Sequence, residues 1–204
     1  MKKNLQEKFW IGEFGHRYVS RNTEKKLNIN NYFFFKKILQ KKKFNTLIEF
    51  GSNIGLNITA IKKINSNLKK IVAVEINKKA SDILKTKHKS VLVHNSSINS
   101  FDVTEQFDLV LCKGILIHIN PLQLNKVYEK IYKACKKYII IAEYYNPQPV
   151  RINYRGHKDK LFKRDFAGEL LKKYKKLKLV DYGFAYQYDK YPQDDITWFL
   201  LRKN

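Results

Sequence analysis

Short apolar runs that alternate with helix-like windows constrain the fold of this chain more than any other feature. Each run spans four to six residues and is rich in β-branched side chains, as strands buried on both faces are. The runs are residues 46–50, 71–75, 91–94, 107–112 and 138–143, and the windows are 56–63, 78–86 and 122–135. Regular strand–helix alternation predicts right-handed βαβ units, and therefore a doubly wound, mostly parallel sheet between two helical layers.

The two ends of the chain depart from this repeat. Residues 1–43 hold an aromatic, glycine-punctuated stretch and then a helical window at 28–39, so we expect a helical lid or cap there. Residues 177–188 and 195–201 are extended segments around a turn, and we expect them to form an antiparallel pair at one edge of the sheet. The 204 residues fit one domain of α/β class. The prediction is a Rossmann-like, three-layer α/β/α sandwich with an antiparallel C-terminal edge strand.

Composition excludes several classes of protein. The chain has 41 basic and 18 acidic residues, yet 44% hydrophobic content excludes a disordered chain. No window approaches the roughly 18 apolar residues of a membrane span. Residues 1–7 are basic and lack an apolar stretch, so we do not expect a secretory signal there. The two cysteines, Cys112 and Cys135, lie in apolar segments, so we expect a cytoplasmic protein without a metal site. The net charge of +23 predicts attraction of anionic ligands.

A glycine loop and an acidic residue follow the first two predicted strands, at the edge where doubly wound sheets bind ligands. Gly51 and Gly55 let the backbone turn and approach a ligand, and the next helix points its N-terminal amides at that ligand. Glu75, 24 residues after Gly51, can accept hydrogen bonds from both hydroxyls of a ribose. Alone, each feature also fits an ordinary strand-to-helix turn or a solvated carboxylate.

Two residues of the loop indicate which cofactor it would bind. Asn53 replaces the middle glycine of a dinucleotide fingerprint, and Glu49 disfavours a pyrophosphate but suits an ammonium group. This chemistry predicts S-adenosylmethionine.

The pattern Glu49-x-Gly51-x-x-x-Gly55, followed by Glu75, resembles the first two motifs of class I S-adenosylmethionine-dependent methyltransferases. Residues 107–121 resemble the fourth-strand segment of the same superfamily. A narrower resemblance, to small methylases associated with pseudaminic acid biosynthesis, rests on residues 10–22, 113–121, 143–147, 154–157 and 163–166. The resemblance implies that 44–145 is the cofactor-binding core, and that 146–204 holds a substrate loop and the C-terminal strands.

The resemblance also implies contacts to S-adenosyl-L-methionine. Glu49 and the amides around Gly51 would face the methionine end, Glu75 the ribose, and Ile76 the adenine. Ser96 and Ser97 stand where many members have an aspartate for the adenine amine. The full set of implied cofactor contacts is Tyr18, Arg21, Asn22, Glu49, Gly51, Asn53, Gly55, Glu75, Ile76, Ser96, Ser97 and Lys113.

Methyl transfer from a sulfonium is an in-line displacement, so the enzyme mainly needs alignment, and a base only where the acceptor loses a proton. His118, with an unperturbed pKa near ~6.5, is a candidate base, although it could equally cap the helix that follows. The expected catalytic set is His118, Glu143, Tyr145 and His157.

Three of the six arginines lie in 151–164 and could hold a carboxylate or phosphate of the acceptor. The expected acceptor-binding set is Tyr144, Asn146, Tyr154, Arg155, Lys163 and Arg164.

These features predict a methyltransferase whose acceptor is a small anionic or polar molecule, such as a nonulosonate-type sugar or its biosynthetic intermediate. A methyltransferase of tRNA or rRNA is a rival interpretation. A nucleic-acid partner is not favoured, because 35 of the 41 basic residues are Lys in short, dispersed runs and the fourth predicted strand ends in Cys-Lys-Gly-Ile rather than an Asn/Asp-Pro-Pro-Tyr loop. The same fold could also serve a non-catalytic protein that binds an adenosyl ligand, or an oxidoreductase, which Asn53 disfavours. The sequence indicates no membrane partner and no particular oligomeric state.

Overall fold

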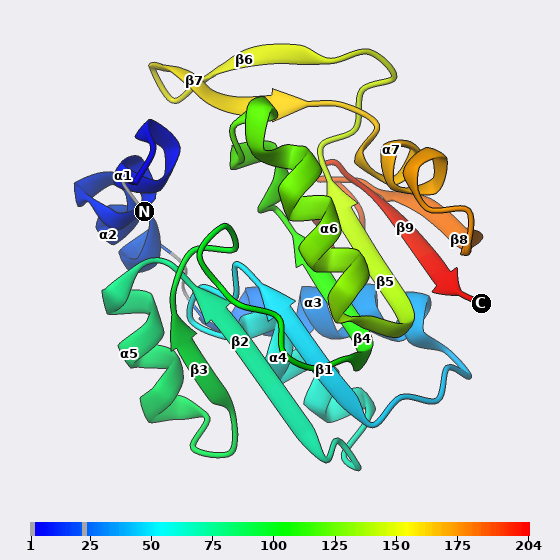
Figure 1. The fold of residues 1–204 in the computed structure, drawn as a ribbon. Coiled ribbons are helices and arrows are strands. Elements are labelled where there is room, and N and C mark those ends of the chain that lie inside the picture. Colours follow the sequence, from blue (N-terminus) through cyan, green and yellow to red (C-terminus); the bar gives the residue numbers. More distant parts are fainter. Residues whose placement is uncertain (1–2, 22–23) are drawn as a thin grey trace.

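The apolar runs form a seven-stranded sheet in the computed structural model, which describes residues 3–21 and 24–204 (Figure 1). The strand order is β3-β2-β1-β4-β5-β9-β8. The strands are β1 (Thr46–Phe50), β2 (Lys70–Glu75), β3 (Leu92–Asn95), β4 (Phe107–Lys113), β5 (Cys135–Glu143), β8 (Leu177–Ala185) and β9 (Ile196–Lys203). The first five pair in parallel, whereas β9 is antiparallel to both β5 and β8. The predicted doubly wound, mostly parallel sheet with an antiparallel C-terminal pair is confirmed.

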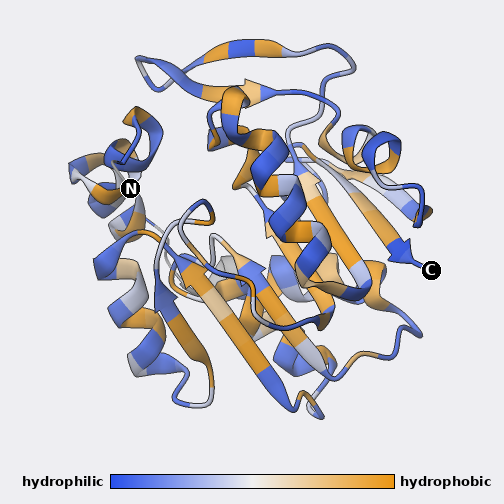
Figure 2. Cartoon of the chain, in the orientation of Figure 1, coloured by the Kyte–Doolittle hydropathy of each residue, from blue (hydrophilic) through white to orange (hydrophobic). Residues whose placement is uncertain are grey.

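Helices cover both faces of the sheet. One layer comprises α3 (Glu24–Leu39), α4 (Leu56–Ile64) and α5 (Lys78–Lys87), and the other comprises α6 (Leu124–Ala134) and α7 (Phe166–Lys173). Figure 2 shows the apolar residues concentrated in the central strands, with polar residues on the outer sides of the helices. The three-layer sandwich therefore follows from amphipathic helices that bury one stripe each.

Alternate residues of the central strands supply the two cores. In β1, Ile48 and Phe50 pack with α6 and α7, whereas Leu47 packs with α3 and α4. This alternation is the period of two that a strand imposes on its side chains. The run at 91–94 was expected to be buried on both faces, but β3 is the outer strand of the sheet and Leu92 is 53% exposed. A strand at the edge of a sheet has a neighbour on one side only, so its side chains are less covered than those of a central strand. The apolar content of the run did not show whether the strand would be central or at the edge.

Two parts of the chain lie beyond the carboxyl ends of the parallel strands (Figure 1). The first consists of α1 (Leu5–Ile11) and α2 (Glu13–Arg21). The second is a separate two-stranded ribbon of β6 (Val150–Tyr154) and β7 (His157–Lys163). Two short 3₁₀ turns, η1 (Leu116–His118) and η2 (Pro121–Gln123), follow β4 at the same end of the sheet.

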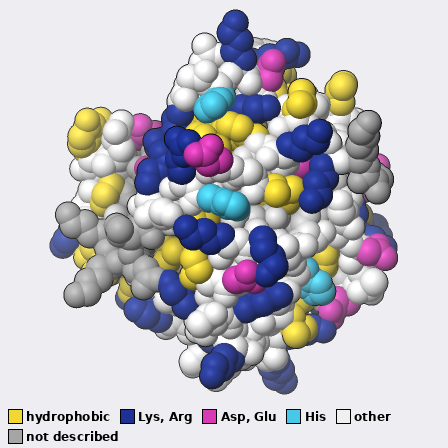
Figure 3. Space-filling view, turned by 90° about the vertical axis from the view of Figure 1, so that its left-hand side faces the viewer, with side chains coloured by type: hydrophobic (Ala, Val, Ile, Leu, Met, Phe, Trp, Pro, Cys, Tyr) yellow, Lys and Arg dark blue, Asp and Glu magenta, His cyan; other side chains and the backbone are white. Residues whose placement is uncertain are grey.

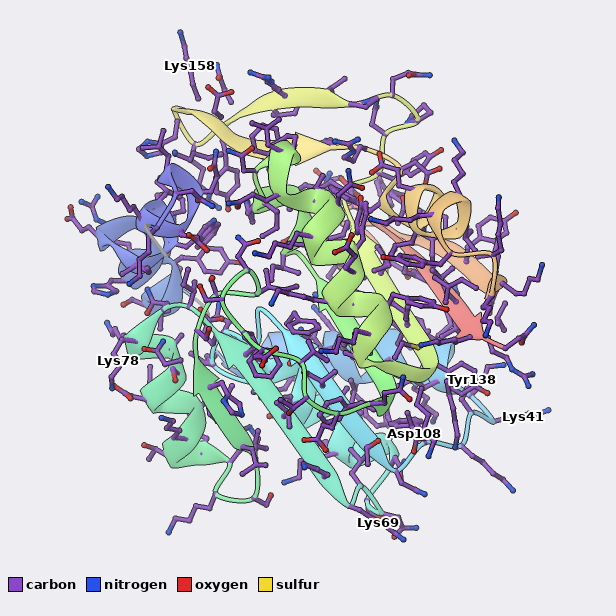
Figure 4. All side chains as sticks on the ribbon, in the orientation of Figure 1. Lys41, Lys69, Lys78, Asp108, Tyr138 and Lys158 are labelled. Carbon is purple, nitrogen blue, oxygen red and sulfur yellow. The ribbon has the colours of Figure 1, made fainter. Side chains whose placement is uncertain are left out.

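Charged side chains lie at the opposite end of the sheet. Figure 4 shows Lys41, Lys69 and Asp108 at that end, whereas Lys158 projects from the tip of the β6–β7 ribbon. Asp108, in β4, accepts a hydrogen bond of 2.8 Å from the backbone N–H of Asn45 and pairs with Lys137. These contacts link β4 to the segment before β1 and to β5, at the amino-terminal end of the parallel strands. No helix in the described part of the chain is long and apolar enough to cross a membrane.

Candidate functional site

A cavity of about 660 Å³ lies at the carboxyl ends of β1, β2, β4 and β5. Its walls come from α1 and α2, from η1, from the β6–β7 ribbon and from the loop between β8 and β9. This volume is in the range of small-molecule sites, and the place is the one where a doubly wound sheet binds its ligands. The cavity is therefore the candidate active site.

Residues 51–53 of the glycine loop line this cavity, whereas the predicted contact Gly55 does not and lies against His88 and Leu84. Gly51 has a φ of +76°, and a Cβ there would lie 3.0 Å from the side chain of Ile115. Gly55, with a φ of +82°, precedes α4 and makes no side-chain cap, so the first N–H groups of that helix carry no capping side chain. Both glycines therefore serve the backbone conformation that the sequence motif predicted.

Glu75 fixes the loop that follows β1. One carboxylate oxygen accepts the backbone N–H of Asn53 at 2.7 Å, and the other accepts the backbone N–H of Asn77 at 2.7 Å. Burial raises the pKa of Glu75, and the hydrogen bonds from Asn77 and Asn53 oppose that rise. The side chain lines the cavity, so its remaining lone pairs can accept two further donors there.

Glu49 lies behind the cavity wall rather than in it. Its side chain is fully buried, and its Oε1 accepts a hydrogen bond of 2.7 Å from the amide of Asn57, which lines the cavity. The other carboxylate oxygen, Oε2, has no partner among the described residues. Burial raises the pKa of Glu49 to about 7. Glu49 therefore borders the cavity through Asn57 and not with its own side chain.

The implied contacts to the ribose and adenine divide into two groups. The side chains that line the cavity are Tyr18, Asn53, Glu75, Ile76, Ser96, Ser97 and Lys113, together with Gly51. Arg21 does not line it and lies 5.6 Å from the ring of Phe14, while Asn22 lies outside the described residues. Burial lowers the pKa of Lys113, whereas Asp194, Glu49 and Glu143 act to raise it.

Glu143 and His118 both line the cavity, as the predicted catalytic set requires. Glu143 Oε1 accepts the backbone N–H groups of Ile115 and Leu116 at 3.0 and 2.9 Å, which anchors the turn that carries His118. Its Oε2 has no partner among the described residues, and burial raises its pKa to about 7. His118 Nδ1 lies 2.7 Å from the carbonyl oxygen of Lys160. Because a carbonyl only accepts, Nδ1 carries the proton and Nε2 is the free base.

Burial lowers the pKa of His118 to about 4, so the ring is neutral at pH 7. A proton acceptor works best when its pKa lies near the working pH. Glu143, with a pKa of about 7, therefore matches proton transfer at neutral pH better than His118 does.

The other two members of the expected catalytic set, Tyr145 and His157, lie outside the cavity lining. Tyr145 is 41% exposed and its ring centroid lies 5.9 Å from that of Phe199. Its neighbours Glu143 and Tyr144 both line the cavity, whereas Tyr145 does not. The ring of His157 packs edge-on against Phe9, at 4.9 Å between centroids.

Four of the six expected acceptor-binding residues line the cavity, and the other two do not. Tyr144, Tyr154, Arg155 and Lys163 line the cavity, and no salt bridge to Arg155 or Lys163 occurs in the described chain. Asn146 is turned to the backbone carbonyl of Gln148. Arg164 is turned to the Glu169 carboxylate at 2.6 Å, a contact within the α7 layer. Local hydrogen bonds therefore hold these two side chains away from the cavity.

Sequence reasoning missed one wall completely. The loop from β8 to β9 contributes Gln187 and residues 192–195, and α3 and α4 contribute Asn31 and Asn57. Because β9 is antiparallel to both of its neighbours, β8 runs parallel to β5 and its carboxyl end delivers this loop to the cavity edge. The predicted antiparallel pair contained this signal, since the pairing direction fixes where the connecting turn must lie.

The free acceptors of the site fit a ligand that carries several donors. Three buried oxygens, Glu49 Oε2, Asn53 Oδ1 and Glu143 Oε2, have no hydrogen-bond partner within the described chain. Buried polar atoms are nearly always paired in folded proteins. An ammonium group, ribose hydroxyls and an adenine amine, as S-adenosylmethionine presents, supply such donors. Among residues 3–21 and 24–204, no group of three or more His, Cys, Asp and Glu could hold a metal ion.

Comparisons with known proteins agree with this geometry. Residues 48–141 match the family model described as a methyltransferase domain. An S-adenosylmethionine-dependent methyltransferase from Leishmania major has a similar fold, with a TM-score of 0.70 and 13% identity over 99% of this chain and 87% of that chain. One from Clostridium acetobutylicum gives 0.65 and 13% over 94% and 98%. The N-methyltransferase NodS from Bradyrhizobium japonicum, in complex with S-adenosyl-L-homocysteine, gives 0.67 and 13% over 94% and 99%. No curated protein matches the sequence.

The matched residues and the Rossmann-like sheet agree with each other. Residues 48–141 match a methyltransferase domain, and the chain has the fold of S-adenosylmethionine-dependent methyltransferases. The structural likeness lies at low sequence identity and concerns the fold, so the identity of the acceptor has to be argued from the side chains of the cavity.

Proposed function

We propose that this chain is a methyltransferase that uses S-adenosyl-L-methionine as its methyl donor. We propose that its acceptor is a small polar molecule that carries an anionic group, such as a nonulosonate-type sugar or its biosynthetic intermediate. The observation that carries this proposal is the pair of cations, Arg155 and Lys163, that line the same cavity as the cofactor socket without a salt bridge in the described chain. An arginine and a lysine without ionic partners at a cavity wall are suited to a carboxylate or phosphate.

Aromatic side chains support a polyhydroxylated acceptor beside those cations. Tyr144 and Tyr154 line the cavity, and their rings lie under Lys163 and Arg155 at 5.2 and 5.9 Å. Phenol hydroxyls both donate and accept hydrogen bonds, which suits the hydroxyls of a sugar. The narrower sequence resemblance to methylases of nonulosonate pathways points to the same chemical class.

S-adenosylmethionine supplies a methyl group bound to a sulfonium, and the chain's own residues supply alignment and proton transfer. Glu143 holds the turn of η1 with one oxygen, and its other oxygen has no hydrogen-bond partner in the described chain. We propose that this free oxygen accepts the proton of the acceptor group, and that neutral His118 orients the acceptor through Nε2. Tyr145 and His157 are not part of this proposed machinery.

We also propose that residues 1–43 act as a lid over the core of 44–145, with the substrate loop in 146–204. Trp10 and Tyr18 line the cavity, and the carbonyl of Trp10 accepts a hydrogen bond of 2.9 Å from Asn77 at the start of α5. Excluding water from the cavity strengthens electrostatic contacts inside it.

A nucleic-acid substrate is not proposed. On the face that Figure 3 shows, Lys and Arg side chains are separated by acidic, apolar and uncharged ones, without a continuous basic band. A binding track for a phosphate backbone needs such continuity.

The test is methyl incorporation from labelled S-adenosylmethionine into nine-carbon sugar acids, compared with the same sugars whose carboxylate is reduced to an alcohol. We expect incorporation only into the acids. Arg155→Ala and Lys163→Ala should each raise the acceptor KM about 10-fold or more, from the loss of a charge-assisted hydrogen bond, and leave the Kd of S-adenosylhomocysteine unchanged.

The matched control is Arg151→Ala, on the same ribbon. Arg151 pairs with Asp159 at 3.3 Å and does not line the cavity, so its loss should leave the acceptor KM unchanged. Equal methylation of the acid and the alcohol, or equal effects of the three substitutions, would contradict the proposal.

A further inference from the structure

Three amide side chains on the cavity wall form a continuous hydrogen-bonded chain that ends on Glu49. Gln193 Nε2 donates to Asn31 Oδ1 at 3.3 Å, and Asn31 Nδ2 donates to Asn57 Oδ1 at 3.0 Å. Asn57 Nδ2 then donates to Glu49 Oε1 at 2.7 Å. The four residues come from the β8–β9 loop, α3, α4 and β1, so the chain joins elements that are far apart in the sequence.

The carboxylate at one end sets the direction of the whole chain. An ionised carboxylate only accepts hydrogen bonds, so Asn57 must turn its NH₂ group toward Glu49 and its oxygen toward Asn31. The same argument turns the NH₂ group of Asn31 toward Asn57, and that of Gln193 toward Asn31. Asn31 and Gln193 are 5% and 7% exposed, which leaves little water to replace a lost partner.

The loop that carries Gln193 is fastened to the helix that carries Asn31. The rings of Tyr191 and Phe33 are stacked at 3.7 Å between centroids with an interplanar angle of 14°. Inside the loop, the backbone N–H and the side-chain amide of Gln187 both donate to the Asp195 carboxylate, at 2.9 and 2.7 Å. Stacking and hydrogen bonding together hold the loop as a fixed wall of the cavity.

All three amides line the cavity, while Glu49 does not. A ligand group at this wall therefore meets amide nitrogens and oxygens whose orientation the carboxylate has already set. A wall with fixed donors and acceptors suits a group that carries both charges at once, an α-ammonium beside an α-carboxylate.

We propose that Asn31, Asn57 and Gln193 are positioning residues that orient Glu49 and bind the amino-acid end of the methyl donor. The β8–β9 loop thereby becomes the third wall of this subsite, beside the glycine loop and α3. The inference rests on the proposed function only in that S-adenosylmethionine occupies the cavity, and it does not depend on the identity of the acceptor.

Two ligands that differ in one part separate this role from general support of the cavity. S-adenosylhomocysteine carries the amino-acid end, whereas 5′-methylthioadenosine keeps the adenosine and the thioether but lacks that end. The variants are Asn31→Leu and Gln193→Met, which are close in size to the native residues and remove the hydrogen bonds. We expect each to raise the Kd of S-adenosylhomocysteine at least about 10-fold and that of 5′-methylthioadenosine less than about twofold, as measured by calorimetry.

Asn65→Leu is the matched control. Asn65 ends α4 and donates to the Phe44 carbonyl at 2.6 Å, outside the cavity lining, so this variant also loses a structural asparagine contact. Its affinities for both ligands should equal those of the wild-type protein, and thermal unfolding of all three variants verifies that they fold.

Each remaining outcome overturns the inference in a recognisable way. Equal weakening of both ligands in Asn31→Leu would mean that the amides support the whole cavity, and unchanged affinities would mean that they do not contact the ligand. A wild-type protein that bound neither ligand would refute S-adenosylmethionine as the occupant. Failure of the acceptor assay alone, with the calorimetric pattern intact, would refute only the proposed acceptor.

Discussion

The carboxylate of Glu75 accepts the backbone N–H of Asn53 at 2.7 Å, so the acid that ends β2 holds the loop that ends β1. Its second oxygen accepts the backbone N–H of Asn77, at the start of α5. The residue that we expect to bind the ribose hydroxyls therefore also holds the glycine loop in place by a hydrogen bond. We therefore expect ligand binding and loop geometry to depend on the same side chain.

Glu75→Ala should lose binding of S-adenosylhomocysteine by at least about 100-fold. The substitution removes two charge-assisted hydrogen bonds to the loops, each worth about 1.5–3 kcal/mol, as well as the acceptors for the ribose. Calorimetric titration measures the Kd directly. Glu75→Gln keeps one acceptor oxygen and should lose less affinity, while an unchanged Kd in the alanine variant would refute the assignment of this socket.

The cost of side chains at two glycines should differ because only one of them faces a neighbour. A Cβ at Gly51 would meet Ile115 at 3.0 Å, whereas a Cβ at Gly114 would meet nothing within 4 Å, although both residues have positive φ. Gly114→Ala should lower the free energy of unfolding by about 1–2 kcal/mol, the usual cost of a left-handed alanine. Gly51→Ala should lose about 1–3 kcal/mol more from overpacking. Urea unfolding measures both, and equal losses would show that the loop relaxes around the extra methyl group.

Much of the fold could be predicted from the sequence because the central strands and helices are locally consistent. Strands β1, β2, β4 and β5 are continuous apolar runs, and the helices between them carry one apolar stripe each. The β6–β7 ribbon was missed, since its residues are mostly polar and exposed. Its turn did carry a signal: Arg155 and Gly156 both have positive φ, and a glycine in that position between alternating segments is typical of a tight hairpin.

The candidate site was predictable where it follows strand ends and unpredictable where it depends on distant contacts. Glu75 and the glycine loop were found because a motif fixes their spacing. Asn31 and Gln193 are ordinary amides in sequence, and only the packing of the β8–β9 loop on α3 joins them. Tyr145 was placed in the catalytic set because it follows the fifth predicted strand, but its ring lies against Phe199 of β9 and outside the cavity lining.

Glu49 should make the stability of the cofactor-free protein depend on pH. Burial raises its pKa from 4.5 to about 7, so the folded protein binds this proton more tightly than the unfolded chain does. Its contribution to the free energy of unfolding is therefore present below about pH 4.5 and lost as pH rises through about 7. Relative to Glu49→Gln, the wild-type protein should lose up to about 3 kcal/mol over that window. Parallel urea unfolding series from pH 4 to pH 8 test this, and a constant difference between the two proteins would contradict it.

Binding of S-adenosylhomocysteine should release a proton near pH 7. An ammonium group at the amide wall lies one hydrogen-bonded residue from Glu49, and positive charge favours the ionised carboxylate. Calorimetry in two buffers of different ionisation enthalpy counts the released protons. The release should vanish in Glu49→Gln and persist in Glu143→Gln, since only Glu49 is coupled to the ammonium through Asn57. Release that is lost in Glu143→Gln instead would assign the titration to the other carboxyl group.

His118 should stay neutral throughout the working range of the enzyme, and Glu143 should set the pH dependence of turnover. Burial lowers the pKa of His118 to about 4, and its Nδ1–H is held by the carbonyl of Lys160. Nitrogen NMR of the labelled ring should therefore show the neutral Nδ1–H form from pH 5 to pH 9.

Once an acceptor has been identified, kcat should rise as the pH increases through about 7, where the Glu143 carboxyl ionises. That limb should persist in His118→Gln, with lower kcat, and disappear in Glu143→Gln. A histidine that titrates above pH 6, or a limb that survives in Glu143→Gln, would reverse the two roles.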